Sequence, residues 1–128
     1  MNRIVLDASV LLAVLNREPG ADKLTPQLLN VATSSTVNLA EVQSKLVHRG
    51  LSPQEAWEAT VSPIREATAF SAEHAMTAGN LVAETRTLGL SLGDRACLAL
   101  GLALNAPVYT ADKSWKSLKL GIRIHVIR

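Results

Sequence analysis

Aromatic residues and cysteine are scarce in this sequence. Phe, Trp and Tyr make up 3% of the 128 residues, whereas apolar residues make up 48%. The core must therefore be aliphatic, which suits an α/β protein better than an aromatic-rich β-sandwich. The single cysteine, Cys97, excludes an internal disulfide and fits a reducing compartment. Its apolar neighbours predict that Cys97 is a small core residue.

The sequence also lacks a long hydrophobic run. Asp7 interrupts the apolar stretch near the N-terminus, so we do not expect a signal peptide there. The longest other run, Cys97–Leu104, is too short to span a bilayer. We therefore expect a soluble, cytoplasmic protein with no membrane partner.

Neither sign of charge dominates, because the net charge is only +2. The distribution of the basic residues is uneven. Five of the 13 fall in the last 16 positions, namely Lys113, Lys116, Lys119, Arg123 and Arg128. This C-terminal group is either an ordinary solvated surface or a surface that contacts phosphates.

Hydrophobic periodicity predicts strands that alternate with helices. The expected strands are Arg3–Leu6, Val31–Thr33, Ile64–Phe70, Pro107–Tyr109 and Ile122–Ile127. Helices are expected between them, including Ala21–Leu29, a helix that begins at Thr36, and Asp94–Leu104. A capping box is expected at Ser52, and a left-handed residue at Gly50. This order predicts an α/β fold, with a mostly parallel five-stranded sheet, helices on both faces and one domain over residues 1–128.

Four of the 11 acidic residues lie against markedly apolar segments. Asp7 and Asp112 each follow a predicted strand, Asp94 opens a predicted helix, and Glu41 lies inside one. Each has an ordinary structural explanation. The three aspartates could cap helix N-termini, and Glu41 could form a surface ion pair with Lys45 four residues later.

Taken together, the four acids indicate a metal site. The carboxyl ends of parallel strands meet at one edge of a sheet, where such folds bind ligands. Carboxylates gathered there repel one another unless a cation keeps them ionised. An all-oxygen set suits Mg²⁺ or Mn²⁺, and the three histidines are too scattered to favour a softer metal. The reaction that such a site supports is metal-assisted phosphodiester hydrolysis.

Other reaction classes find less support in the sequence. It has no G-x-G-x-x-G, Walker A or H-E-x-x-H motif, and we expect no serine nucleophile elbow.

Four segments resemble the PIN-domain ribonucleases, and most closely the VapC-type toxins of type II toxin-antitoxin modules. The segments are IVLDASVLLAVLNREPG, SSTVNLAEVQSKL, LSLGDRACLALG and PVYTADKSWKSL. LSLGDRACLALG followed shortly by PVYTADKSW is the most specific part. The resemblance covers essentially the whole chain and implies a PIN-like three-layer fold.

The resemblance also implies roles for individual residues. Asp7 and Asp94 correspond to the principal Mg²⁺ ligands, and Glu41 and Asp112 to acids that position water or a second ion. Ser9, Asn38 and Thr110 are expected to support them by hydrogen bonding.

The implied activity is that of an Mg²⁺-dependent endoribonuclease that acts as a toxin. Its implied partners are an RNA substrate, a small inhibitory antitoxin and a second copy of the chain in a homodimer. Two alternatives remain open. One is a solitary PIN-like RNA-processing nuclease, and the other is a non-catalytic RNA-binding or protein-binding module whose acids are mainly caps.

Overall fold

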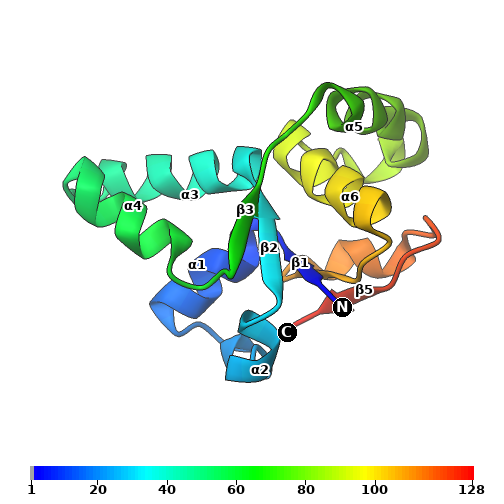
Figure 1. Ribbon diagram of the computed structural model, residues 1–128. Helices are drawn as coiled ribbons and strands as arrows, with labels where there is room; N and C mark the ends of the chain where they lie inside the picture. Colours follow the sequence, from blue (N-terminus) through cyan, green and yellow to red (C-terminus); the bar gives the residue numbers. More distant parts are fainter. Residues whose placement is uncertain (1) are drawn as a thin grey trace.

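A parallel β-sheet forms the centre of the fold (Figure 1). The computed structural model describes residues 2–128. Its five strands lie in the order β3-β2-β1-β4-β5, and all four pairings are parallel. The strands are β1 (Ile4–Leu6), β2 (Ala32–Ser35), β3 (Glu66–Thr68), β4 (Val108–Thr110) and β5 (Ile124–Val126). The sheet predicted from periodicity is thereby confirmed.

Helices cover both faces of this sheet. The α-helices are α1 (Ala8–Asn16), α2 (Pro26–Leu29), α3 (Thr36–His48), α4 (Pro53–Val61), α5 (Ala72–Glu84) and α6 (Leu92–Leu104). Three short 3-10 helices are η1 (Ala21–Lys23), η2 (Arg86–Leu88) and η3 (Lys113–Ser117). None of the helices in residues 2–128 combines the length and the apolar character needed to cross a membrane.

Strand β1 separates two aliphatic cores. Successive side chains of a strand point to opposite faces, so Ile4 and Leu6 enter one core and Val5 enters the other. The first core lies under α1, α3 and α4, and the second lies under α5 and α6. Because β1 is buried on both faces, the residue that follows it, Asp7, emerges in the middle of the molecule.

Local signals determine several element boundaries. Ser52 and Glu55 form the expected capping box at the start of α4, with Pro53 in the first turn. Gly50 follows α3 with a φ of 107°, as expected for a left-handed residue after a helix.

Two helix predictions were wrong in their bounds. The single helix expected over Ala21–Leu29 is two short pieces, η1 and α2, because Thr25 caps a new helix that has Pro26 at its start. The helix expected from Asp94 begins two residues earlier, at Leu92, with Ser91 as its N-cap. Asp94 is therefore the third residue of α6 and does not open it.

Candidate functional site

All four predicted acids line one cavity. Its volume is about 270 Å³, and it lies where the carboxyl ends of β1 and β4 meet α3 and α6. Its lining consists of Asp7, Ala8, Ser9, Leu12, Glu18, Glu41, Lys45, Asp94, Asp112 and Arg128. The fold thus brings together acids that are up to 105 positions apart, from Asp7 to Asp112. Of the supporting residues, Ser9 lines the cavity itself.

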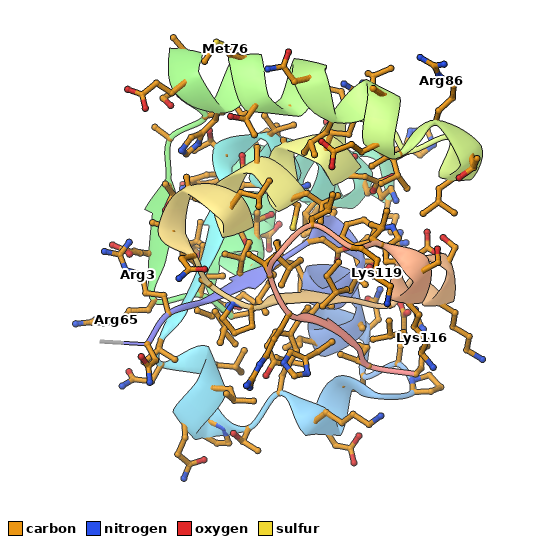
Figure 2. The ribbon with its side chains drawn as sticks, turned by 90° about the vertical axis from the view of Figure 1, so that its right-hand side faces the viewer. Arg3, Arg65, Met76, Arg86, Lys116 and Lys119 are labelled. Carbon is orange, nitrogen blue, oxygen red and sulfur yellow. The ribbon has the colours of Figure 1, made fainter. Side chains whose placement is uncertain are left out.

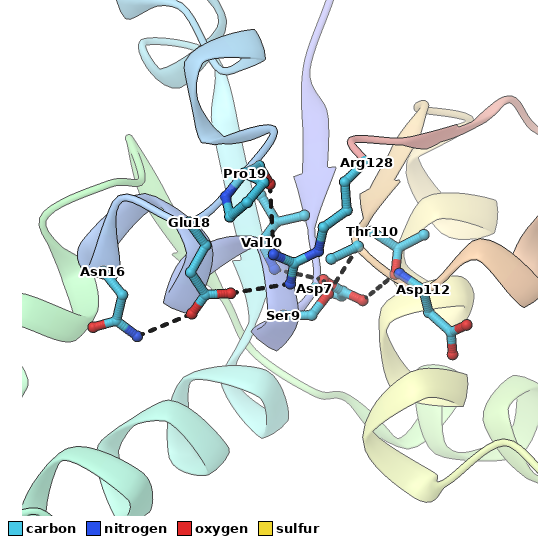
Figure 3. Close-up of polar contacts among 10 residues, drawn as sticks. Asp7, Ser9, Val10, Asn16, Glu18, Pro19, Thr110, Asp112 and Arg128 are labelled. Carbon is cyan, nitrogen blue, oxygen red and sulfur yellow. Dashed lines mark hydrogen bonds and ion pairs between the residues drawn. The ribbon is translucent and has the colours of Figure 1, made fainter.

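Asp7 is the most buried of the four, with 4% of its surface exposed. Its Oδ1 accepts hydrogen bonds from the Ser9 hydroxyl at 2.6 Å and from the Val10 backbone N–H at 2.9 Å. Its Oδ2 accepts one from the Thr110 hydroxyl at 2.6 Å (Figure 3). Asp7 therefore caps α1, as the structural explanation required, but two further side chains also hold its carboxylate.

Burial raises the pKa of Asp7 to about 6, from an ordinary value of 3.8. The hydrogen bonds from Ser9, Thr110 and Val10 oppose this shift, and the negative charge of Asp94 adds to it. The hydrogen bonds of the protein thus offset only part of the energetic cost of burying the ionised Asp7 carboxylate. A cation in the cavity would supply the missing compensation.

Ser9 and Thr110 connect Asp7 to the loop that carries Asp112. The Ser9 hydroxyl accepts from the Ala111 N–H at 2.9 Å, and the Thr110 hydroxyl accepts from the Asp112 N–H at 3.1 Å. Each hydroxyl therefore donates to Asp7 and accepts from the loop after β4. This network fixes the first and fourth acids relative to each other.

Asn38 holds Glu41 against α6. The Asn38 Nδ2 donates to Glu41 Oε1 and to the Gly93 carbonyl, both at 3.0 Å. Asn38 is 1% exposed, and its Oδ1 has no hydrogen-bond partner within residues 2–128. Gly93 lies directly beside the Glu41 carboxylate, because a Cβ there would overlap with Oε1. The Glu41–Lys45 ion pair, the structural explanation considered for Glu41, is not among the ion pairs of the described residues, which are Arg3–Glu66 and Arg128–Glu18.

Asp94 belongs to the capping box of α6. Its Oδ2 accepts from the Ser91 N–H at 3.0 Å, and the Ser91 hydroxyl accepts from the Asp94 N–H at 3.2 Å. Ser91 is the centre of GLSLG, which matches the G-x-S-x-G pattern of serine hydrolases. It follows a 3-10 turn and caps a helix, whereas a nucleophile elbow requires a strand before the serine. The expectation that no such elbow exists therefore holds despite the motif.

Asp112 is the most exposed of the four acids and caps η3. Its Oδ1 accepts from the Ser114 N–H at 2.9 Å and from the Ser114 hydroxyl at 2.7 Å. Three of the four acids therefore make the capping contacts that the structural explanation predicts. All four nevertheless line the same cavity, which that explanation does not require.

Cys97 lies beneath the acids in α6 and is fully buried. Burial raises the pKa of its thiol well above the usual range, and the charges of Asp7, Asp94 and Glu41 raise it further. The thiol is therefore neutral and unreactive, as expected for a core residue.

The donor set fits a hard divalent cation. Within residues 2–128, no group of three or more His, Cys, Asp or Glu side chains is arranged so that it could hold a metal ion, so any ion here would be held by fewer protein ligands. Mg²⁺ is commonly held by one or two carboxylates, with water in its remaining positions. The buried Asp7 carboxylate supplies such an oxygen ligand to the cavity.

Sequence reasoning missed three charged residues of the cavity: Glu18, Lys45 and Arg128. Glu18 is not among the four acids that lie against apolar segments, and Lys45 enters the sequence analysis only as a possible partner for Glu41. Arg128 was one of five basic residues near the C-terminus, and it alone among them lines the cavity. Only Glu18 carried a local signal, since it lies within the NREPG end of the first family-like segment.

Comparison with protein families identifies the fold. The model of the PIN domain matches residues 4–120. This chain belongs to the PIN domain family. A sequence comparison of this PIN domain with curated proteins gave no match.

Solved structures similar to this PIN domain include VapC proteins. A VapBC complex of Rickettsia felis bound to a promoter DNA fragment has a TM-score of 0.75 at 21% identity, with 98% of both chains covered. A DNA-bound VapBC of Salmonella typhimurium has a TM-score of 0.78 at 18% identity, with 100% of both chains covered. A VapC toxin of Mycobacterium tuberculosis that cleaves the sarcin-ricin loop has a TM-score of 0.71 at 20% identity, with 94% and 98% covered. The predicted PIN-like three-layer fold is confirmed.

Proposed function

We propose that this PIN domain is an Mg²⁺-dependent endoribonuclease and acts as the toxin of a toxin-antitoxin module. The supporting observation is that Asp7, Glu41, Asp94 and Asp112 line one cavity at the carboxyl edge of the sheet. The similar VapBC and VapC structures, one of which is a toxin that cleaves the sarcin-ricin loop, support the toxin role and RNA as the substrate.

In this proposal Asp7 and Asp94 are the principal ligands of Mg²⁺, with Mn²⁺ as an alternative ion. When bound, the ion supplies positive charge to the phosphodiester oxygens and helps to activate the attacking water. Glu41 and Asp112 would position water or a second ion. Ser9, Thr110 and Asn38 hold the carboxylates in place through the hydrogen bonds described above.

The proposal includes two protein partners. A small antitoxin would inhibit the enzyme by placing a basic side chain among the acids, since a guanidinium pairs well with carboxylates. A second copy of the chain would form a homodimer, which sedimentation of the purified protein would detect.

Replacement of Asp94 by Asn tests the nuclease. The variant keeps an acceptor for the Ser91 N–H but loses a charge, so it should fold normally and neither cleave RNA nor arrest growth. Chelation of divalent ions with EDTA should abolish cleavage by the unaltered protein. Full cleavage by the variant, or in EDTA, would show that the proposed mechanism is wrong.

The capping contacts favour a second candidate, a non-catalytic RNA-binding or protein-binding module. Asp7, Asp94 and Asp112 all accept backbone N–H groups at helix starts. In such a module, Asp112→Ala should lower the free energy of unfolding by about 1 kcal/mol, a typical value for removal of a cap, without changing any RNA cleavage. A solitary RNA-processing nuclease would instead cleave RNA with no antitoxin gene beside its own.

A further inference from the structure

The cavity carries positive charge as well as negative charge. Lys45 from α3 and Arg128 after β5 both line it together with the four acids. An RNA strand carries a charged phosphate at every nucleotide, so a purely acidic cavity would repel the substrate of the proposed nuclease. Cations at its rim remove this obstacle.

Several contacts hold Arg128 in this position. Its Nη2 lies 3.0 Å from Glu18 Oε1, and its Nη1 lies 3.5 Å from the Pro19 carbonyl (Figure 3). Asn16 donates to the other Glu18 oxygen at 3.2 Å. These hydrogen bonds and the charge of Arg128 lower the pKa of Glu18, so Glu18 stays ionised. Both Glu18 oxygens are thus occupied, which makes Glu18 an anchor for Arg128 rather than a fifth metal ligand.

Gly20 allows the chain end to pack close enough for this contact. Its φ is 91°, and a Cβ there would overlap with the Ile127 carbonyl. Ile127 is 1% exposed, and its N–H donates to the Thr110 carbonyl at 2.9 Å. The residue before Arg128 is therefore fixed on the sheet, and about a third of the Arg128 side chain (33%) remains exposed to solvent. The guanidinium has five N–H donors, so donors remain for a ligand.

A basic stripe continues from the cavity along α3. Glu41, Lys45, His48 and Arg49 recur at helical spacing and share one face of the helix. Lys45 lines both the acidic cavity and a second hollow, which is formed with Ser44, His48 and Arg49. Arg49 also contributes to the lowered pKa of Glu18, which places it on the same side of the molecule.

The C-terminal lysines do not share this placement. Lys113, Lys116 and Lys119 are exposed on or beside η3, and none of them lines the acidic cavity. Figure 2 shows Lys116 and Lys119. Of these two basic surfaces, only the α3 stripe contributes a residue, Lys45, to the lining of the acidic cavity.

We propose that Lys45 and Arg128 bind the RNA phosphates on either side of the cleaved bond, and that the strand leaves the cavity along α3 over His48 and Arg49. This inference rests on the proposed nuclease function. It replaces the C-terminal lysine surface with a defined path for the substrate.

Salt-dependent binding of a short, fluorescein-labelled oligouridylate tests the path. We use the Asp94→Asn protein in the presence of Mg²⁺, so that binding is measured without cleavage. On a single strand, each phosphate that a basic side chain neutralises adds about 0.7 to the slope of log Kd against log salt concentration. Lys45→Gln and Arg128→Gln should each reduce the slope by about that amount. Arg86→Gln is the matched control, because η2 contributes no residue to the cavity.

Two comparisons make the test specific. Lys116→Gln with Lys119→Gln should leave the slope unchanged, and a reduction there but not at Lys45 and Arg128 would overturn the inference. Glu18→Gln keeps an oxygen that can accept from Arg128 and removes a negative charge beside the strand, so RNA binding should be unchanged or tighter. If Glu18→Gln and Arg128→Gln instead weaken binding equally, the pair is only structural and the inference is wrong.

Kinetic measurements of RNA cleavage distinguish a failure of this inference from a failure of the proposed function. In a protein with Asp94 intact, Lys45→Gln and Arg128→Gln should raise KM several-fold and change kcat little. If the unaltered protein cleaves RNA and neither variant raises KM, the nuclease stands and the path is wrong. If the unaltered protein does not cleave RNA, the proposed function fails, and the binding slopes still decide whether the α3 stripe binds RNA.

Discussion

At the scale of single residues, Asp7 combines a structural contact with an energetic cost. It caps α1, yet burial raises its pKa to about 6. Since the folded-state pKa lies above the ordinary value of 3.8, the folded protein favours the neutral acid. The contribution of the raised Asp7 pKa to the free energy of unfolding is fully present below about pH 4. It is lost as the pH rises through about 6, where Asp7 ionises in the folded protein.

Asp7→Asn should therefore stabilise the metal-free protein at neutral pH. The free energy of unfolding should rise by at most about 3 kcal/mol near pH 8, and the gain should vanish near pH 4. Urea denaturation in EDTA at both pH values measures this. Asp22→Asn, at an exposed acid in η1, is the control and should show no such change with pH. A loss of stability near pH 8 would mean that the hydrogen bonds to Asp7 outweigh its burial.

Gly93→Ala should disturb Glu41 without unfolding the protein. The added Cβ would occupy the place of the Glu41 carboxylate, and a flexible side chain can swing away at little cost. We expect unfolding free energy to change by no more than about 1 kcal/mol, the helix preference for Ala over Gly. RNA cleavage should fall, and the Mg²⁺ concentration for half-maximal activity should rise.

Gly79→Ala is the matched control for this change. Gly79 also lies in a helix, α5, and a Cβ there would meet no atom within 4 Å. This variant should be slightly more stable and cleave RNA normally. Normal cleavage and Mg²⁺ dependence in Gly93→Ala would show that the position of Glu41 does not matter.

At the scale of elements, two capping boxes allow a direct comparison. Ser52 caps α4 and Ser91 caps α6, each with an acid at the third helical position. Only the α6 box contains a residue of the acidic cavity, Asp94. The same local motif therefore serves stability alone in one helix and also positions a carboxylate in the other.

Ser52→Ala and Ser91→Ala should destabilise the protein to a similar extent, by about 1 kcal/mol each. Only Ser91→Ala should also weaken Mg²⁺ binding, because it loosens the turn that carries Asp94. Isothermal titration with Mg²⁺ and chemical denaturation give the two quantities. Equal Mg²⁺ affinities in the two variants would mean that the α6 box has no part in the site.

The helix bounds show what local patterns could predict. The left-handed Gly50 and the capping box at Ser52 were predicted correctly. Each is a local feature, because the residues that form it lie within a few positions of one another in the sequence. The predicted start of α6 was wrong because Asp94 is itself a residue type that commonly caps helices, although Ser91, three residues earlier, is the cap. Two reciprocal hydrogen bonds identify Ser91 as the cap: the Ser91 N–H donates to the Asp94 carboxylate, and the Asp94 N–H donates to the Ser91 hydroxyl.

At the scale of the whole molecule, the cavity should couple ion binding to stability. A ligand that binds only the folded state stabilises it, by about 2.7 kcal/mol at a hundred times its Kd. Mg²⁺ should therefore raise the melting temperature above pH 6, and less so below it, where Asp7 becomes protonated.

Thermal melting with MgCl₂, against KCl of equal ionic strength, checks this expectation. Asp7→Asn and Asp94→Asn should lose most of the shift, and Asp22→Asn should keep it. If Mg²⁺ raises the melting temperature of the unaltered protein and of all three variants equally, the ion binds outside this cavity.

The sequence by itself determined the strands, the aliphatic core and the four acids. Each strand-to-helix junction is a local pattern, and Asp7, Glu41, Asp94 and Asp112 stand out against apolar neighbours. Only the tertiary structure decided how the acids are supported. The contact between Asn38 and Gly93 spans 55 positions, and that between Glu18 and Arg128 spans 110. Such pairs leave no periodic signal in the chain, because sheet topology and the packing of the chain end, rather than local propensity, bring them together.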